Sequence, residues 1–288
     1  MHRLTSLLLT AVSLLCQSDS PVPAGTGPHK AIFEGDPGVP GHTVYRPADL
    51  AAFGPANALP VLAWANGGCA NSSRGFANFL IELASHGYLA VAIGPPVPPG
   101  EGAARQPTSY KQLLQALDWA TAENGRPASK YYRKLNPAKF AVMGQSCGGL
   151  QALEASPDQR VTTSVIMNSG VLNTTGGAPK MPVSITKDSL RQLHAPVLYV
   201  IGGTKDIAFP NAADDFAKLE HVPVALANLE VGHGGTYAQP NGGEFARVAL
   251  AWLDWQLKGD QTAAKMYSGP SCGLCTDANW RLEKKRIP

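Results

Sequence analysis

A serine and a cysteine stand side by side in the segment MGQSCGG, and either side chain could act as a nucleophile. Ser146 is the middle residue of a Gly-x-Ser-x-Gly pattern that follows the apolar segment KFAVMG and precedes a predicted helix at residues 148–156. A tight strand–turn–helix connection exposes the middle residue of this pattern, and the N-terminus of the helix favours developing negative charge. The context therefore predicts Ser146 as the nucleophile, with Cys147 supplying a backbone amide from the next position.

A serine hydroxyl becomes reactive when a base removes its proton, and histidine is the commonest base. In this context the expected order along the chain is serine, acid, histidine, which excludes every histidine before Ser146. His194 and His221 end predicted helices, where a histidine suits the helix dipole. His233 follows the last apolar strand in the glycine-flanked segment VGHGG, so it is the predicted base. An exposed loop histidine without a catalytic role is the competing interpretation.

The carboxylate that orients the base is expected after the penultimate strand, where the segment LYVIGGTKDIAFP carries Asp206. A strand end followed by small residues and an aspartate is where this arrangement presents its acid. An aspartate that only caps the next helix is the alternative. Asp214 and Asp215 fall in the first turns of a predicted helix at residues 211–220, and we interpret them as partners of its dipole.

A carbonyl under attack develops negative charge on its oxygen, which two backbone N–H groups can stabilise as an oxyanion hole. One N–H is expected from Cys147, the residue after the nucleophile, and the other from the loop ANGGCANSS after the third strand. Gly67 and Gly68 let that loop bend, so Gly68 or Cys69 is predicted to aim its amide inward. Gly68, Cys69 and Cys147 are also the predicted substrate contacts.

The segments that must position these residues alternate between short apolar runs and amphipathic helices. Repeated strand–helix units predict an α/β fold with a mostly parallel eight-stranded sheet, helices on both faces and no large lid domain. The predicted strands lie at residues 31–35, 42–47, 59–68, 88–94, 139–144, 163–170, 195–203 and 224–232. The predicted helices lie at residues 76–87, 109–125, 148–156, 187–194, 211–220 and 242–259. One catalytic domain at residues 31–260 holds them all, and a tail at 261–288 follows.

The composition of the chain argues against several classes of function. The chain has 288 residues, 44% of them apolar, and a net charge of only +3 with scattered basic residues. Neither a nucleic acid nor an acidic membrane surface is therefore an expected partner. No apolar run after the N-terminus is long enough to span a bilayer. No cofactor is expected, and the sequence favours a monomer while leaving the oligomeric state open.

The N-terminus has the features of a signal peptide. The segment MHRLTSLLLTAVSLLC combines a basic start with an apolar stretch of about a dozen residues, and a segment rich in proline, glycine and serine follows. We therefore predict a signal peptide at residues 1–18, a linker at 19–30, and a secreted or periplasmic protein. A buried N-terminal helix is the alternative.

Removal of the leader leaves four cysteines, Cys69, Cys147, Cys272 and Cys275. Four cysteines in an exported chain indicate disulfides, for which three pairings exist. Cys272 and Cys275 could instead form half of a zinc site. No second pair of ligands at the required spacing accompanies them, so no metal is predicted.

The segments quoted above together resemble the α/β-hydrolase superfamily, and within it the dienelactone hydrolase-like and the cutinase- and PET-hydrolase-like secreted serine esterases. GQSCGG matches the nucleophile segment, GGTKDIAFP the acid segment and VGHGGTY the base segment, over roughly residues 40–260. The resemblance implies a Ser146–His233–Asp206 triad with the amides of Cys69 and Cys147 as oxyanion donors. The chain departs from the polyester hydrolases in having Cys69 where they carry an aromatic residue. It departs from the dienelactone hydrolases, whose nucleophile is a cysteine, in having a serine.

The two oxyanion donors suggest a disulfide. If the amides of Cys69 and Cys147 face one oxyanion, their Cα atoms lie within or near the roughly 4.4–6.8 Å that a disulfide spans. We therefore predict a Cys69–Cys147 disulfide, which leaves Cys272 and Cys275 to pair locally or to remain a dithiol. Two buried free thiols, packed as small apolar groups, are the alternative.

These expectations combine into a secreted serine esterase that cleaves a small or polymeric carboxylic ester through an acyl-enzyme intermediate. A hydrolase of amide or lactone bonds on the same fold is the first alternative. A binding protein that keeps the fold and has lost the reaction is the second.

Overall fold

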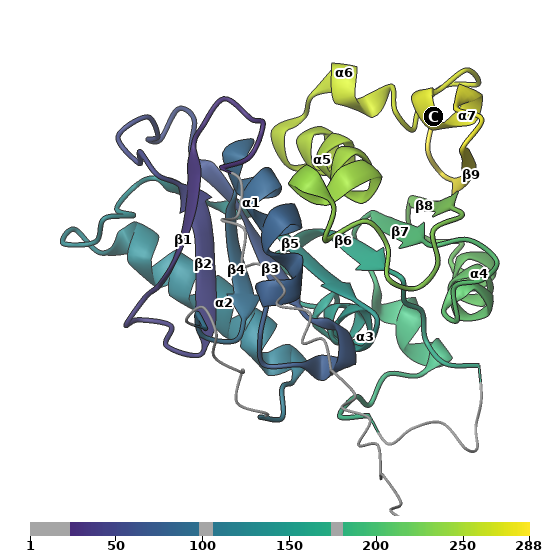
Figure 1. Ribbon diagram of the computed structural model, residues 1–288, viewed down its shortest axis with the longest axis horizontal. Helices are drawn as coiled ribbons and strands as arrows, with labels where there is room; N and C mark the ends of the chain where they lie inside the picture. The colour runs from purple at the N-terminus through teal and green to yellow at the C-terminus, as the bar shows by residue number, and fades with distance from the viewer. Residues whose placement is uncertain (1–23, 98–105, 174–180) are drawn as a thin grey trace, which may run out of the picture.

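The computed structural model describes residues 24–97, 106–173 and 181–288, and the strands within these ranges form one nine-stranded sheet (Figure 1). The strand order is β1-β2-β4-β3-β5-β6-β7-β8-β9. The strands are β1 (Ala31–Gly35), β2 (His42–Pro47), β3 (Leu59–Ala65), β4 (Leu89–Ile93), β5 (Leu135–Gln145), β6 (Val161–Met167), β7 (Val197–Ile201), β8 (Val224–Leu229) and β9 (Trp280–Lys285). The predicted signal peptide at residues 1–18 lies outside the described residues.

Most of the sheet is parallel. Strands β4, β3, β5, β6, β7 and β8 are neighbours that run in one direction, whereas β1, β2 and β9 pair antiparallel with their neighbours. This sheet confirms the predicted fold class and contains all eight predicted strands. The ninth, β9, comes from the segment 261–288, and its sequence WRLEKK has too few apolar residues to show a strand pattern. Charged residues of this kind are typical of edge strands.

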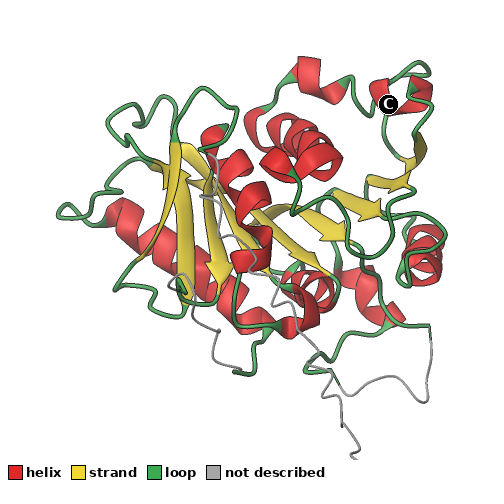
Figure 2. Cartoon of the chain, in the orientation of Figure 1, coloured by secondary structure: helices red, strands yellow, loops and turns green. Residues whose placement is uncertain are grey.

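Helices cover both faces of the sheet (Figure 2). Helices α1 (Ala77–Ser85) and α5 (Gly243–Lys258) pack on one face, and α2 (Tyr110–Gly125), α3 (Cys147–Ala155) and α4 (Phe209–Lys218) pack on the other. Two short helices, α6 (Gln261–Ala264) and α7 (Gly273–Thr276), precede β9. The helix predicted at residues 187–194 is a 3₁₀ segment, Lys187–Gln192. No helix in the described ranges is long and apolar enough to cross a membrane.

Alternate side chains of the strands build two apolar cores. In β3, Val61 and Ala63 face the core beneath α2, α3 and α4, whereas Leu62 and Trp64 face the core beneath α1 and α5. All four side chains are fully buried. This alternation follows from the two-residue period of a strand, and burial on both faces is expected for a parallel sheet covered by helices.

The parallel strands place their carboxyl ends at one edge of the sheet. Strands β5, β6, β7 and β8 are neighbours, so the loops that follow them lie side by side. Ser146 follows β5, Asp206 lies in the loop after β7, and His233 lies in the loop after β8. Open α/β sheets bind their ligands at this edge.

Candidate active site

The backbone at Ser146 forms a sharp turn between β5 and α3. Ser146 has φ 54° and ψ −121°, a conformation that costs energy for a residue with a side chain and that is concentrated at functional sites. The turn depends on close backbone contacts. A Cβ added at Gly144 would lie 2.2 Å from the carbonyl oxygen of Gly148, and one added at Gly148 would lie 2.2 Å from that of Ala65. The glycines of the Gly-x-Ser-x-Gly pattern therefore allow β3, β5 and α3 to meet beside Ser146.

The side chains of Ser146, His233 and Asp206 meet in one hydrogen-bonded chain. His233 Nε2 lies 2.9 Å from Ser146 Oγ, and His233 Nδ1 lies 2.7 Å from Asp206 Oδ1. With the ring proton on Nδ1, His233 donates to Asp206 and accepts the hydroxyl proton of Ser146. The side chain of Asp206 is 0% exposed and that of His233 is 30% exposed. The acid is thus sheltered from water, while the imidazole is open to a ligand.

Asp206 is surrounded by hydrogen-bond donors. Its Oδ2 accepts from Asn168 Nδ2 at 2.7 Å and from the amide of Gly202 at 2.9 Å, and its Oδ1 also accepts from the amide of Ala208 at 2.9 Å. Burial by itself raises the pKa of Asp206. The hydrogen bond from His233, together with the three other donors, outweighs burial and holds this pKa below its usual value, so the carboxylate is charged at neutral pH.

The predicted oxyanion loop is joined to the nucleophile turn by a disulfide. Cys69 and Cys147 are bonded, with their Cα atoms 5.1 Å apart, which confirms the predicted disulfide. Cys69 ends the 3₁₀ turn Gly67–Cys69, and Gly68 and Cys69 have φ 63° and 49°. Cys147 is the first residue of α3, where a helix leaves its amides without intrahelical partners. The two sulfur-bearing residues are 6% and 4% exposed.

Two side chains that were not predicted as site residues donate hydrogen bonds to the backbone of the loops that carry Cys69 and His233. Thr108 Oγ1 donates to the carbonyl oxygen of Cys69 at 2.8 Å. Gln145 Nε2 donates to the carbonyl oxygen of His233 at 3.1 Å, which connects the residue before the nucleophile to the loop after β8. Neither contact follows from sequence spacing, because each joins segments that only the fold brings together.

The interpretation of Asp215 as a partner of the helix dipole is wrong. Helix α4 begins at Phe209, earlier than predicted, so Asp215 lies in its second half rather than its first turns. The carboxylate is fully buried and accepts hydrogen bonds from Lys187 Nζ at 2.6 Å, the amide of Val171 at 2.8 Å and Tyr199 Oη at 3.2 Å. Burial raises its pKa to about 6 in spite of these donors. The hydrogen bond from Val171 connects α4 to the loop after β6.

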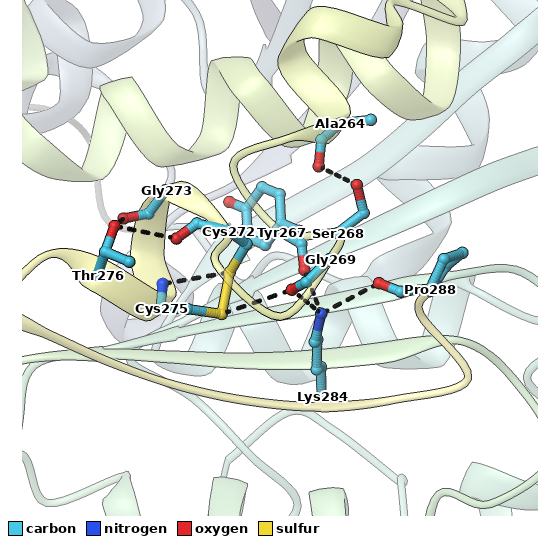
Figure 3. Close-up of a disulfide and its surroundings, with 10 residues drawn as sticks. All are labelled: Ala264, Tyr267, Ser268, Gly269, Cys272, Gly273, Cys275, Thr276, Lys284 and Pro288. Carbon is cyan, nitrogen blue, oxygen red and sulfur yellow. Dashed lines mark hydrogen bonds between the residues drawn. A yellow bond between two sulfur atoms is a disulfide. The ribbon is translucent and has the colours of Figure 1, made fainter.

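A second disulfide, Cys272–Cys275, lies apart from this site in the segment between α6 and β9 (Figure 3). Cys272 Sγ accepts a hydrogen bond from the amide of Cys275 at 3.1 Å. Beside it, Lys284 of β9 donates to the carbonyl oxygens of Tyr267 and Gly269. Within the described ranges no group of three or more histidine, cysteine, aspartate or glutamate side chains could hold a metal ion.

One comparison with known proteins gives a match. The family model described as "PETase: PET hydrolase-like" matches residues 18–279, which includes every residue discussed for this site. A search of curated proteins finds no match.

Proposed function

Because the chain belongs to the PET hydrolase-like family, whose fold is the α/β-hydrolase fold, we propose that it hydrolyses carboxylic esters with Ser146, His233 and Asp206 as its catalytic triad. Family membership indicates a hydrolase that acts on esters. The observation that carries the finer assignment is the hydrogen bond of 2.9 Å between Ser146 Oγ and His233 Nε2, in a ring whose other nitrogen contacts a buried carboxylate. A serine nucleophile needs a base within hydrogen-bond distance, and the base needs an acid that orients its ring.

In the proposed first step, His233 Nε2 removes the hydroxyl proton of Ser146 while Oγ attacks the ester carbonyl carbon. The carbonyl oxygen becomes an oxyanion, which the amides of Cys69 and Cys147 stabilise. Asp206 stabilises the imidazolium and keeps the ring in one tautomer. The imidazolium then gives its proton to the alkoxy leaving group, the carbon–oxygen bond of the ester breaks, and an acyl-enzyme remains on Ser146.

In the proposed second step, His233 removes a proton from water, whose oxygen attacks the acyl carbon. The second oxyanion collapses, Ser146 Oγ leaves with the proton held by His233, and the carboxylic acid is released. The 30% exposure of the His233 side chain supports access for this water. Cys147 takes no part as a nucleophile, because its sulfur is bonded to Cys69.

We propose export for the chain, since a signal peptide is predicted at its N-terminus and its two disulfides suit an oxidising compartment. For the substrate we propose a carboxylic ester, small or polymeric. A residue with an aromatic ring is absent at position 69, so a stacking contact with an aromatic polymer unit cannot come from that side chain.

The experiment that tests the proposal combines labelling with a substrate panel. A fluorophosphonate probe should label Ser146, and peptide mapping identifies the site. Nitrophenyl esters of increasing acyl length and a polyester film should then rank the substrates. Labelling without turnover of any ester, amide or lactone would favour a binding protein, and turnover of amides or lactones in preference to esters would favour the other hydrolase assignment.

A further inference from the structure

Asn168 occupies an unusual position at the end of β6. It is 0% exposed and has φ 43°, in the left-handed region that asparagine tolerates better than most residues with a side chain. Its amide donates to the carbonyl oxygen of Val200 at 2.8 Å, so the backbone continues the pairing of β6 with β7 to this point. Such backbone strain is kept where the surrounding structure requires it.

The side-chain amide of Asn168 contacts three partners whose chemistry sets its orientation. Nδ2 donates to Asp206 Oδ2 at 2.7 Å and to the carbonyl oxygen of Gly232 at 3.3 Å. Oδ1 accepts the hydroxyl proton of Tyr237 at 2.5 Å. The nitrogen thus faces two acceptors and the oxygen faces a donor, so a rotation of the amide by half a turn would place like groups against each other.

These contacts tie together the loops after β6, β7 and β8. Asn168 follows β6, Asp206 belongs to the loop after β7, and Gly232 and Tyr237 flank His233 in the loop after β8. The next residue along, Ser169, donates through Oγ to the carbonyl oxygen of Ser146 at 2.7 Å. Two consecutive residues after β6 therefore contact both ends of the hydrogen-bonded chain.

We propose that Asn168 is a positioning residue for the triad: it holds Asp206 Oδ2, so that Oδ1 stays directed at His233 Nδ1. This inference rests on the proposed function of the triad. A carboxylate can rotate about its bond to Cβ, and a donor on the oxygen away from the histidine limits that rotation. Hydrogen-bond partners of this kind orient the groups that touch the reacting atoms, and their removal lowers turnover.

The direct test removes the amide while preserving the backbone. Asn168→Gly tolerates φ 43° and deletes the contacts to Asp206, Gly232 and Tyr237. We expect kcat to fall by about 10- to 100-fold, the loss typical of one hydrogen bond to a charged group, with KM little changed. Tyr237→Phe deletes only the contact to Asn168 Oδ1, so its effect should have the same sign and be smaller.

A matched control lies at the other end of the same strand. Thr163 is 0% exposed, donates to the carbonyl oxygen of Pro196 and accepts from Trp252 Nε1, each at 2.8 Å. Thr163→Val has nearly the same shape and loses both hydrogen bonds away from the triad. We expect it to lower the unfolding midpoint while leaving kcat and its pH dependence unchanged. Loss of turnover through destabilisation alone would appear in this variant too.

The sharpest test is Asn168→Asp, which places a carboxyl group of the same shape beside Asp206. At low pH the two groups share a proton and the donor is restored, whereas at higher pH two carboxylates at hydrogen-bond distance repel each other. The wild type has no second carboxyl group at this position, so its kcat/KM should not fall over the same pH range. That of Asn168→Asp should fall with rising pH.

The titratable and charged groups around this pair are few in the described residues. His233 and Tyr237 contact it directly, and burial raises the pKa of Tyr237, so its hydroxyl keeps its proton. Lys205 and Glu230 belong to the adjoining loops and are exposed. Asp215 of α4 contacts the loop after β6 at Val171, three residues after Asn168.

A second readout needs no substrate. The proton on His233 Nδ1 should give a downfield NMR resonance in the wild type and in Thr163→Val, and should shift or broaden in Asn168→Gly. If both Asn168 variants keep the wild-type kcat, pH profile and resonance, the positioning role is wrong. If the wild type hydrolyses no ester while the resonance responds to Asn168 as expected, the proposed reaction fails and the positioning of the ring stands.

Discussion

The two disulfides of the described residues lie in regions that differ in what the bond holds. Cys69–Cys147 joins residues 78 positions apart and connects the turn after β3 to the residue beside Ser146. Cys272–Cys275 joins residues 3 positions apart and closes a turn before β9. Both half-cystines of the first bond are buried, whereas Cys275 of the second is exposed.

The difference in loop length predicts a difference in stabilisation. A cross-link restricts the unfolded chain more when it closes a longer loop, which gives about 4–5 kcal/mol for Cys69–Cys147 and about 2 kcal/mol for Cys272–Cys275. The difference in position also predicts a difference in the effect on turnover. The first bond holds two loops that the proposed reaction uses together, while the second holds a segment at the edge of the sheet. Loss of the first should therefore affect turnover and stability, and loss of the second stability alone.

The largest effect is expected on kcat at Ser146, whose hydroxyl is essential to the proposed reaction and contributes little to stability. Ser146→Ala should lower kcat by about 10³-fold or more, because the other triad residues act only through this hydroxyl. The unfolding midpoint should stay close to that of the wild type, since Oγ is a small group on a turn. Steady-state kinetics and thermal unfolding measure the two. Turnover above about a tenth of the wild-type value would contradict the assignment of the nucleophile.

Loss of the Cys69–Cys147 disulfide should lower both the stability and the turnover of the protein. The double variant Cys69→Ala/Cys147→Ala should lower the free energy of unfolding by about 2–5 kcal/mol. It should also lower kcat by about 10-fold or more, because a displaced oxyanion donor loses much of its effect. Urea unfolding and ester kinetics below the unfolding midpoint measure them. An unchanged kcat in the folded double variant would show that the bond only stabilises the chain, and the contrast between the two disulfides would reduce to loop length.

A pH-dependent effect on stability is expected from the buried carboxylate of Asp215 in α4. Burial raises the pKa of Asp215 to about 6, above its value near 4 in an unfolded chain, so the folded state binds this proton more tightly. Stability from this group is therefore present below about pH 4 and is lost as the pH rises through about 6, by up to about 2–3 kcal/mol. Asp215→Asn should remove this slope while Lys187 keeps its contact with Asp214. Urea unfolding of both proteins from pH 4 to 8 measures the difference, and parallel curves would contradict it.

The smallest effect belongs to the tail. The double variant Cys272→Ala/Cys275→Ala should lower the free energy of unfolding by about 1–2 kcal/mol, which corresponds to a few degrees in Tm. Its kcat and KM should equal those of the wild type, because none of the contacts of Figure 3 reaches the triad. A tenfold loss of kcat in this variant would break the contrast drawn between the two regions.

Much of the site could be anticipated from residue types and their order. Ser146, Asp206 and His233 follow apolar strands in the order that an α/β-hydrolase requires, and the structure brings their side chains into contact. The Cys69–Cys147 bond could be predicted because two amides that face one oxyanion bring their Cα atoms within the distance that a disulfide spans. Each of these inferences uses information local to a short segment, together with a rule for how such segments meet.

Other features depend on contacts that no local pattern records. Asn168 is an ordinary residue at a strand end, and its importance arises only because β6, β7 and β8 are neighbours. Asp215 is misplaced when α4 is started at Asn211, although Pro210 in the first turn of α4 is a signal for the earlier start. Strand β9 has only two apolar side chains among six, Trp280 and Leu282, which is too few for the segment to be recognised as a strand from the sequence.

The pairing of β8 with β9 also bears on how the chain avoids aggregation. Strand β8, VALANL, is almost entirely buried and apolar, and residues 230–279 separate it from the strand that covers its outer edge. While the chain folds, the hydrogen-bonding groups of that edge stay open until β9 pairs with β8. Once in place, β9 presents Arg281, Glu283, Lys284 and Lys285 along the outermost strand, and such charges oppose the addition of a strand from another molecule. A chain shortened before Trp280 should therefore be prone to associate through β8 even where its triad is intact.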